Sequence, residues 1–278
     1  MGKDKLRKFR ENETFSCLLQ PSAADVLAVV KVDDAAGDDT TGHDGELLKK
    51  DGTLKDHPIK GHWASDFFKN DNPIVVELGC GKGEYTIDLA LRNPSINYIG
   101  VDIKGARLWK GAKYAEEHHL SNVAFLRTNI EMLTAFFAPD EVDEIWITFP
   151  DPQMKKATKR LTSTWFMQRY QQLVRPGGLI HLKTDSPFLY MYTREMLRLN
   201  AYPVWADTAD LYHTAETDTL REAKMLQTHY EHQWLDRGLT IKYLRWQLVP
   251  KTIFEEPQIE IEKDTYRSYG RNYTSTQS

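Results

Sequence analysis

The sequence has few cysteines and no long apolar run, and these two absences narrow its class first. Cys17 and Cys80 are its two cysteines in 278 residues, too few for the disulfide framework of a small secreted domain, so a reducing cytoplasm is the expected compartment. No apolar run approaches about 18 residues, and no apolar stretch follows the basic N-terminal residues. The sequence therefore predicts neither a membrane span nor a secretory signal.

Excess charge is also nearly absent, apart from one acidic segment. Residues 32–56 hold eight acidic residues against three lysines, a net −5, whereas the whole chain carries −4. The remaining residues therefore sum to +1, and the mild acidity does not argue against a nucleic-acid partner. Because the segment is glycine-rich and has few large apolar residues, we expect a flexible surface insertion. Its acids lack the alternate spacing of an EF-hand loop, which disfavours calcium.

Composition divides the chain into four parts: a basic arm (1–31), the acidic insertion (32–56), one large domain (57–250) and a polar tail (251–278). The arm concentrates lysine and arginine within residues 3–10, and is either disordered or in contact with phosphates. The tail interleaves Tyr266, Tyr269 and Tyr273 with arginines. Stacking on RNA is one interpretation of the tail, and disorder is the one we favour.

Within the large domain, β-favouring apolar runs alternate with helical patterns. Strands are expected at 74–76, 98–101, 122–126, 142–149, 179–183 and 240–249. Helices are expected at 84–92, 106–119, 131–137, 164–174 and 228–235, with a tight turn at 175–178. This alternation predicts an α/β fold with a doubly wound, mostly parallel sheet, whose ligands lie beyond the carboxyl ends of the strands.

The first strand leads into a glycine loop with Gly79, Gly81 and Gly83, and the second strand ends on Asp102. An acid at that place accepts hydrogen bonds from ribose hydroxyls, which predicts a nucleoside site. Glu77 would repel the pyrophosphate of a dinucleotide but attract the ammonium and sulfonium of S-adenosylmethionine. We therefore favour a methyl donor, with a dehydrogenase as the alternative.

Other polar residues follow the later strands. Asn129 is placed either to meet the adenine edge or simply to form a turn. Asp151 lies between two prolines, which fix the direction of its carboxylate. Four cations follow within residues 155–160, as a phosphate-binding loop or a solvated one. Asp185 is the third acid at a strand end. His229 and His232 are interpreted as surface residues, so no metal site is expected.

With these residues, the sequence resembles the bacterial-type tRNA (guanine-N7-)-methyltransferases over most of its length. The resemblance rests on these motifs: M-G-K-x-K-L-R-x-F at 1–9, G-x-W at 61–63, F-F-K-N at 67–70, V-E-L-G-C-G-K-G-E at 76–84, I-G-V-D-I-K-G-A-R at 99–107, F-P-D-P at 149–152, P-G-G at 176–178, H-L-K-T-D at 181–185 and T-x-x-E at 228–231. F-P-D-P followed by T-x-x-E is specific to this family, whereas the glycine loop alone is not.

The resemblance implies a single class I (Rossmann-like) methyltransferase domain that uses S-adenosylmethionine and no metal. The implied substrate is a guanosine in the variable loop of tRNA, position 46, and no obligate protein partner is implied. The donor-site residues would be Glu77, the three loop glycines, Asp102, Asn129 and Asp151. Those that face the tRNA would be Lys155, Asp185, Thr228 and Glu231. Three departures from the family pattern are Gln153-Met154 in place of Trp and its variable neighbour, Asn129 where Asp is common, and Asp102 where Glu is common.

The implied chemistry needs alignment more than a base, because guanine N7 already carries an in-plane lone pair. A fixed carboxylate would stabilise the cationic product ring, and Asp151 is the candidate. Two alternatives stay open on sequence alone. One is a methyltransferase acting on a small molecule or a protein, and the other is a non-catalytic, RNA-binding scaffold of the same fold.

Overall fold

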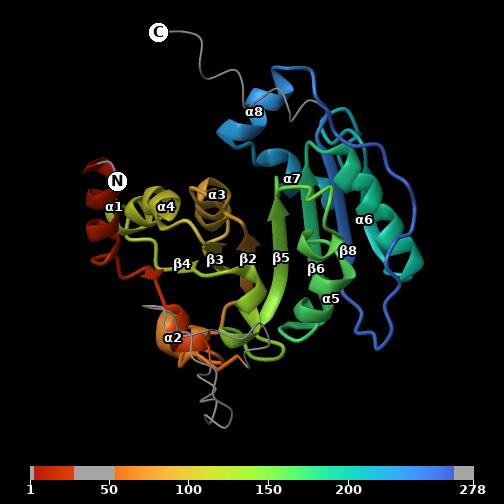
Figure 1. Cartoon of the computed structure of the whole chain (residues 1–278). Coiled ribbons are helices and arrows are strands. Elements are labelled where there is room, and N and C mark those ends of the chain that lie inside the picture. The colour runs from red at the N-terminus through yellow and green to blue at the C-terminus, as the bar shows by residue number, and fades with distance from the viewer. Residues whose placement is uncertain (1–2, 28–53, 266–278) are drawn as a thin grey trace, which may run out of the picture.

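The computed structural model describes residues 3–27 and 54–265, and its framework is one eight-stranded sheet (Figure 1). The strand order is β1-β4-β3-β2-β5-β6-β8-β7. The strands are β1 Leu18–Leu19, β2 Ile74–Leu78, β3 Asn97–Asp102, β4 Val123–Arg127, β5 Val142–Thr148, β6 Val174–Thr184, β7 Val204–Thr208 and β8 Lys242–Gln247. The first six strands in this spatial order, from β1 to β6, are all parallel to their neighbours. Strand β8 runs antiparallel to both β6 and β7. The predicted doubly wound, mostly parallel α/β sheet is confirmed.

Helices cover both faces of the sheet and its carboxyl edge (Figure 1). They are α1 Lys3–Asn12, α2 Ala23–Val26, α3 Glu84–Arg92, α4 Gly105–Glu117, α5 Thr164–Tyr170, α6 Pro187–Leu199, α7 Asp218–Met225 and α8 His229–Leu235. Shorter turns are the π-helix η1 Trp63–Phe68 and the 3-10 helices η2 Ile130–Ala135 and η3 Ala157–Lys159. No helix in the described ranges is long and apolar enough to cross a membrane.

Every residue of β2 is buried, which is why this strand reads as an unbroken apolar run around one acid. Ile74, Val76 and Leu78 pack into the core beneath α5 and α6, whereas Val75 packs into the core beneath α3, α4 and α7. Side chains alternate across a strand, so Glu77 points to the same face as Val75. The sequence thus places one carboxylate inside the sheet, beside the first turn of α3.

The strand order reverses between β2 and β5, whose neighbours on the outer sides are β3 and β6. At such a reversal, the connections after the two adjacent strands run to opposite sides and leave a crevice at the carboxyl ends of these strands. This crevice is the usual ligand site of an open α/β sheet. Figure 1 shows α7 and α8 beyond this edge, next to the end of β5. The reversal therefore fixes where a ligand can lie.

Several predicted elements need correction. The helix expected at 164–174 ends at Tyr170, and Val174 already begins β6. The expected turn at 175–178 is a bulge within β6, because Val142 and Glu144 of β5 pair with Val174 and Leu179. The sequence analysis missed α6, α7 and β7 altogether. The short lengths of β7 and α7, 5 and 8 residues, weaken the periodicity of their patterns. The 13 residues of α6 do carry an apolar helical face, which was not recognised.

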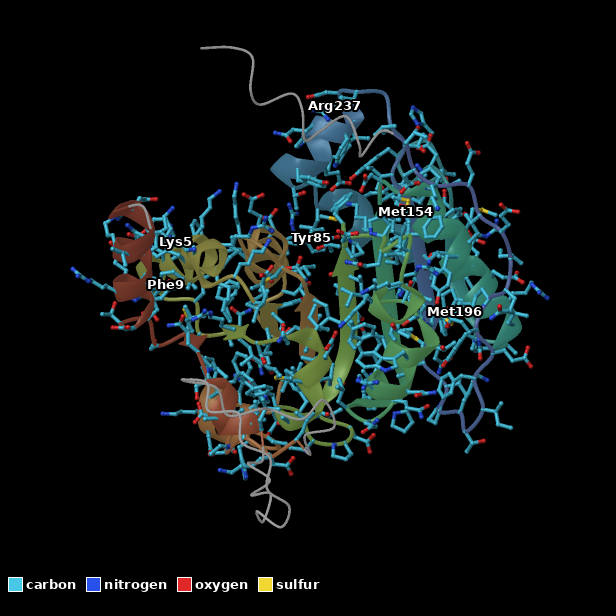
Figure 2. All side chains as sticks on the ribbon, viewed as in Figure 1. Lys5, Phe9, Tyr85, Met154, Met196 and Arg237 are labelled. Atoms are coloured by element: carbon cyan, nitrogen blue, oxygen red, sulfur yellow. The ribbon has the colours of Figure 1, made fainter. Side chains whose placement is uncertain are left out.

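The N-terminal arm is helical over Lys3–Asn12, so disorder, one of the two interpretations left open, does not hold there. The contact with phosphates stays a prediction. Asn12 donates from Nδ2 to the carbonyl of Gly105 at 2.9 Å, and Trp109 of α4 donates from Nε1 to Glu11 at 2.7 Å. Figure 2 labels Lys5 and Phe9 on this helix, at the edge of the molecule. Most of the predicted acidic insertion falls on 28–53, outside the described residues.

Residues 251–265 of the polar tail are ordered, contrary to the expectation of disorder. Glu256 accepts hydrogen bonds from Tyr192 at 2.5 Å and from Thr164 at 2.6 Å. Asp264, 8% exposed, accepts from the Ser186 hydroxyl at 2.5 Å and from the Phe188 amide at 3.0 Å, at the start of α6. The three tyrosines of the tail lie outside the described residues.

We expect Asp264→Ala to lower the free energy of unfolding by about 1–3 kcal/mol, because it removes a carboxylate that bonds to a helix N-terminus. Urea unfolding followed by circular dichroism measures this. Glu262→Ala, at an exposed position in the same segment, is the matched control and should change stability little. Equal midpoints for the two variants would show that the tail contributes nothing to the fold.

Candidate active site

A cavity of about 540 Å³ opens at the carboxyl ends of β2 and β5. Its wall is formed by Glu77, Gly79, Cys80, Gly81, Lys82, Glu84, Tyr85, Arg107, Thr148, Phe149, Thr228, Tyr230 and Gln233. Among the described residues, four predicted site residues belong to this wall: Glu77, Gly79, Gly81 and Thr228. Figure 2 labels Tyr85 between α3 and β5, below α8. The cavity therefore lies at the strand-order reversal, where the fold favours a ligand.

Two of the three loop glycines border open space. Gly79 and Gly81 have left-handed backbones, with φ of 76° and 58°, and a Cβ added to Gly79 would meet no atom within 4 Å. Gly83 differs, because its Cβ would lie 2.5 Å from the Phe125 ring. Gly79 and Gly81 thus leave room for a ligand against the backbone, and Gly83 lets α3 pack closely on β4.

Four amide groups of this loop have partners inside the protein. The amides of Gly79 and Cys80 donate to Val101 O, that of Gly81 to Asp102 Oδ2, and that of Gly83 to Cys80 O, at 2.8 to 3.0 Å. A pyrophosphate site at a helix N-terminus requires such amides to be free. These four amides are therefore not available to a phosphate, and what disfavours a dinucleotide is Glu77, whose carboxylate lies in the cavity wall.

Asp102 holds the glycine loop in place. Its side chain is 8% exposed; Oδ2 accepts from the Gly81 amide at 3.0 Å, and Oδ1 accepts from the Lys104 amide at 2.7 Å. Each oxygen retains a further lone pair with which to accept from a ribose hydroxyl. The ribose contact stays a prediction, to which the structure adds a role in shaping the loop.

Glu77 ties together the three elements that meet at the reversal. Its Oε2 accepts from the Thr86 amide at 2.9 Å and from the Thr86 hydroxyl at 2.5 Å, and its Oε1 accepts from the Thr148 hydroxyl at 2.6 Å. Burial raises the pKa of this carboxyl, and the bonds from Thr148 and Thr86 oppose that rise. The sequence analysis assigned Glu77 only an attraction for the donor, whereas the structure gives it a positioning role as well.

The loop after β5 has two bulky residues in left-handed conformations. Phe149 has φ 48° and Gln153 has φ 46°, and Asp151 lies exposed between them. Asp151 Oδ1 accepts from the Gln153 amide at 3.0 Å, which fixes the turn. Non-glycine residues in this region carry strain of about 1–3 kcal/mol, which persists where the surroundings impose it. The loop therefore presents Asp151 beside Phe149 of the cavity wall.

The four cations after this loop differ in environment. Arg160 is 9% exposed, lies over the rings of Phe188 and Tyr192, and donates to the carbonyls of Gln153 and Met154. It therefore braces the loop and is not available to phosphate. Lys159 forms an ion pair with Glu131, and Lys155 and Lys156 are exposed. The expectation of four phosphate-binding cations is too broad, and the two exposed lysines are the stronger candidates.

Two acids that were expected to face the tRNA are buried instead. Asp185 and Glu231 are both 0% exposed. Lys242 of β8 donates to the backbone carbonyl of Asp185 at 3.1 Å, and Glu231 forms an ion pair with Lys183 at 2.8 Å. Thr228 caps α8, its hydroxyl accepting from the Glu231 amide at 3.2 Å. Asn129 is exposed at the start of η2 and is not part of the cavity wall.

The sequence analysis missed several wall residues, namely Tyr85, Arg107, Phe149, Tyr230 and Gln233. Phe149 is the first letter of the recognised F-P-D-P motif and Tyr230 is a variable position of T-x-x-E, but neither was given a role. Their rings meet edge to face, with centroids 5.7 Å apart. The spacing of the sequence does not predict that α8 packs beside the end of β5. The contact between these two rings is therefore known only from the structure.

We expect Glu77→Gln to weaken S-adenosylmethionine binding by about tenfold or more, because it removes a buried negative charge from the wall of a cationic ligand's site. The pKa of Glu77 is raised, so wild-type affinity should fall as the pH drops through that pKa, and the variant should lose this dependence. Calorimetry over a series of falling pH values measures both effects.

Glu144→Gln is the control, because this glutamate on β5 bonds to Trp146 and His181 and not to the cavity wall. An affinity for the donor that is the same in Glu77→Gln and Glu144→Gln would remove Glu77 from the donor site.

Comparisons with known proteins agree with this geometry. A family model described as "Putative methyltransferase" matches residues 71–244. The chain is 57% identical over 219 residues to the tRNA (guanine-N(7)-)-methyltransferase of Porphyromonas gingivalis, covering 78% of this chain and 89% of that protein. It is 54% identical over 217 residues to that of Bacteroides thetaiotaomicron, covering 78% and 85%. With that of Christiangramia forsetii it shares 46% identity over 249 residues, covering 89% and 99%.

These matches span the glycine loop, the strand-order reversal and most of the fold that surrounds the cavity. On this evidence the chain belongs to the tRNA (guanine-N(7)-)-methyltransferase family.

Proposed function

We propose that this protein transfers the methyl group of S-adenosylmethionine to N7 of a guanosine in the variable loop of tRNA, at position 46, forming 7-methylguanosine. The observation that carries the proposal is the cavity beside Gly79 and Gly81, whose wall includes the buried carboxylate of Glu77. Such a cradle suits a nucleoside without phosphate. The names of the related proteins supply the acceptor atom and the RNA class.

The residues present fit the donor. Gly79 and Gly81 leave space for it, Asp102 offers lone pairs to its ribose, and Glu77 contributes negative charge to the wall. When bound, S-adenosylmethionine supplies an electrophilic methyl group on a sulfonium. We assign Asn129 to the adenine side of this site, as a residue beyond the wall that a bound ligand would reach.

The acceptor base needs a surface and a fixed orientation. Guanine must leave its stack before N7 can approach the methyl group, at a cost of a few kcal/mol. Phe149 and Tyr230 present aromatic rings at the cavity, and Tyr230 is 41% exposed. Base stacking on aromatic side chains contributes about 1–3 kcal/mol per base, which offsets much of the cost of extrusion.

In the transfer step, the N7 lone pair forms the new N–CH₃ bond as the S–CH₃ bond breaks, and the bonding pair returns to sulfur. Positive charge moves from sulfur to the guanine ring, so a fixed carboxylate near the base lowers the barrier. Asp151 is exposed, held by its turn, and two residues from Phe149. We assign this role to Asp151. Asp185 and Glu231 receive no contact with the base, because both are buried.

The first test of the function is incubation with labelled S-adenosylmethionine and bulk tRNA, followed by nucleoside analysis. We expect 7-methylguanosine with the wild type, none with tRNA that carries adenosine at position 46, and a loss of at least about a hundredfold in single-turnover rate for Asp151→Ala. Asp88→Ala, on α3, is the control and should be active. Label in a small molecule or a protein, or binding of tRNA without turnover, would favour the two alternative functions.

A second test separates binding from chemistry. Lys155→Ala with Lys156→Ala should raise the apparent KM for tRNA several-fold and flatten its dependence on salt, because each phosphate contact releases counterions. Single-turnover methylation at saturating tRNA should survive. Lys60→Ala with Arg175→Ala removes two charges at the opposite edge of the sheet, near the amino end of β5, and serves as the control. A salt dependence that is unchanged in the first pair would exclude this loop from the RNA interface.

A further inference from the structure

One wall of the donor cavity comes from a single segment that packs over the sheet's carboxyl edge. We call residues 218–235 the roof; it comprises α7 and α8, and supplies Thr228, Tyr230 and Gln233 to the wall. Figure 1 shows α8 beyond the ends of the strands and α7 between α8 and the sheet. The position of the roof therefore decides the shape of the cavity.

One side chain from the sheet reaches both helices of the roof. Lys183, on β6, is 0% exposed, and its Nζ donates to Ala223 O at 2.7 Å and to Leu226 O at 2.6 Å, at the end of α7. The same nitrogen lies 2.8 Å from Glu231 Oε1 on α8. A cation suits this place, because the last carbonyls of a helix are otherwise unsatisfied and carry its negative end.

The backbone of Lys183 supports the opposite wall. Its carbonyl accepts from the Phe149 amide at 2.8 Å, and Phe149 is the left-handed residue that begins the Asp151 loop. One residue of β6 thus contacts the roof through its side chain and the loop after β5 through its backbone. Lys183 therefore contacts both of the segments that carry the two aromatic rings at the cavity, Phe149 and Tyr230.

Stability alone does not explain the buried pair. Burial lowers the pKa of Lys183 to about 8 while Glu231 opposes that shift, so near neutral pH the ammonium stays mostly protonated. The groups that face it are Glu231, Tyr212 and the ring of Tyr85. Among the described residues, Glu231 Oε2 and the Tyr85 hydroxyl have no hydrogen-bond partner. An apolar pair of similar volume commonly stabilises a core as well as such an ion pair does.

We propose that Lys183 is a positioning residue for methyl transfer: it holds the roof against β6 so that Thr228, Tyr230 and Gln233 complete the donor cavity. Glu231, in this account, acts on the reaction through Lys183 and does not touch guanine. The inference rests on the proposed function for the identity of the donor. The inference gives a role in that function to Lys183, a residue that contacts neither S-adenosylmethionine nor tRNA.

The test is Lys183→Met, with two readouts. Amide hydrogen exchange of the free protein should accelerate about tenfold or more in residues 226–235 and stay unchanged in α6, because the roof loses its attachment to the sheet. The dissociation constant for S-adenosylmethionine, from calorimetry, should rise about tenfold or more. Lys242→Met is the matched control: Lys242 is 6% exposed on the neighbouring β8, and its Nζ donates to Asp185 O and Thr240 O, outside the roof.

A second variant separates positioning from simple loss of stability. Lys183→Met with Glu231→Leu replaces the ion pair by apolar groups, and its thermal midpoint should recover toward that of the wild type. We expect roof exchange and donor affinity to remain perturbed in this variant. Recovery of both along with the midpoint would overturn the proposal, as would unchanged exchange and affinity in Lys183→Met. If the wild type binds the donor yet forms no 7-methylguanosine, the proposed function fails, whereas the exchange measurement still decides the role of Lys183.

Discussion

The site depends on one buried carboxylate, that of Glu77, at the point where the strand order reverses. Glu77 belongs to β2, and its oxygens accept hydrogen bonds from Thr86 in the first turn of α3 and from Thr148 at the end of β5. A buried carboxylate is costly unless it is hydrogen-bonded. Its bonds therefore set the distance between the glycine loop and the Phe149 loop, which are the two sides of the cavity.

Around this centre, the polar residues divide into those that build the site and those that face solvent. Asp102, Arg160, Lys183 and Glu231 are buried and hold loops or helices in place. Asp151, Lys155 and Lys156 are exposed where an RNA substrate would approach. Because mutating a residue of the first group alters geometry, loss of activity alone does not show that such a residue touches substrate. A binding or exchange measurement is needed to distinguish the two groups.

The sequence predicted the parts whose signal is local. The apolar run of β2, the glycines after it and the bounds of α3 at Glu84–Arg92 agree with the structure. What it could not predict depends on contacts between distant segments. Glu231 is paired with Lys183 of β6, and Asp185 lies against Lys242 of β8, which sequence spacing does not reveal. The ordered tail was missed for the same reason, since its polar residues bond to α6 and do not pack as an apolar face.

We propose that a methyl donor lies between the glycine loop and α8 while Glu77 keeps its bonds to Thr86 and Thr148. A crystal structure of the protein with S-adenosylhomocysteine tests it most directly. We predict density for the nucleoside against Gly79 and Gly81, with its ribose on Asp102. Density at another place, or a Glu77 side chain that has lost its bonds to both threonines, would contradict this placement of the donor.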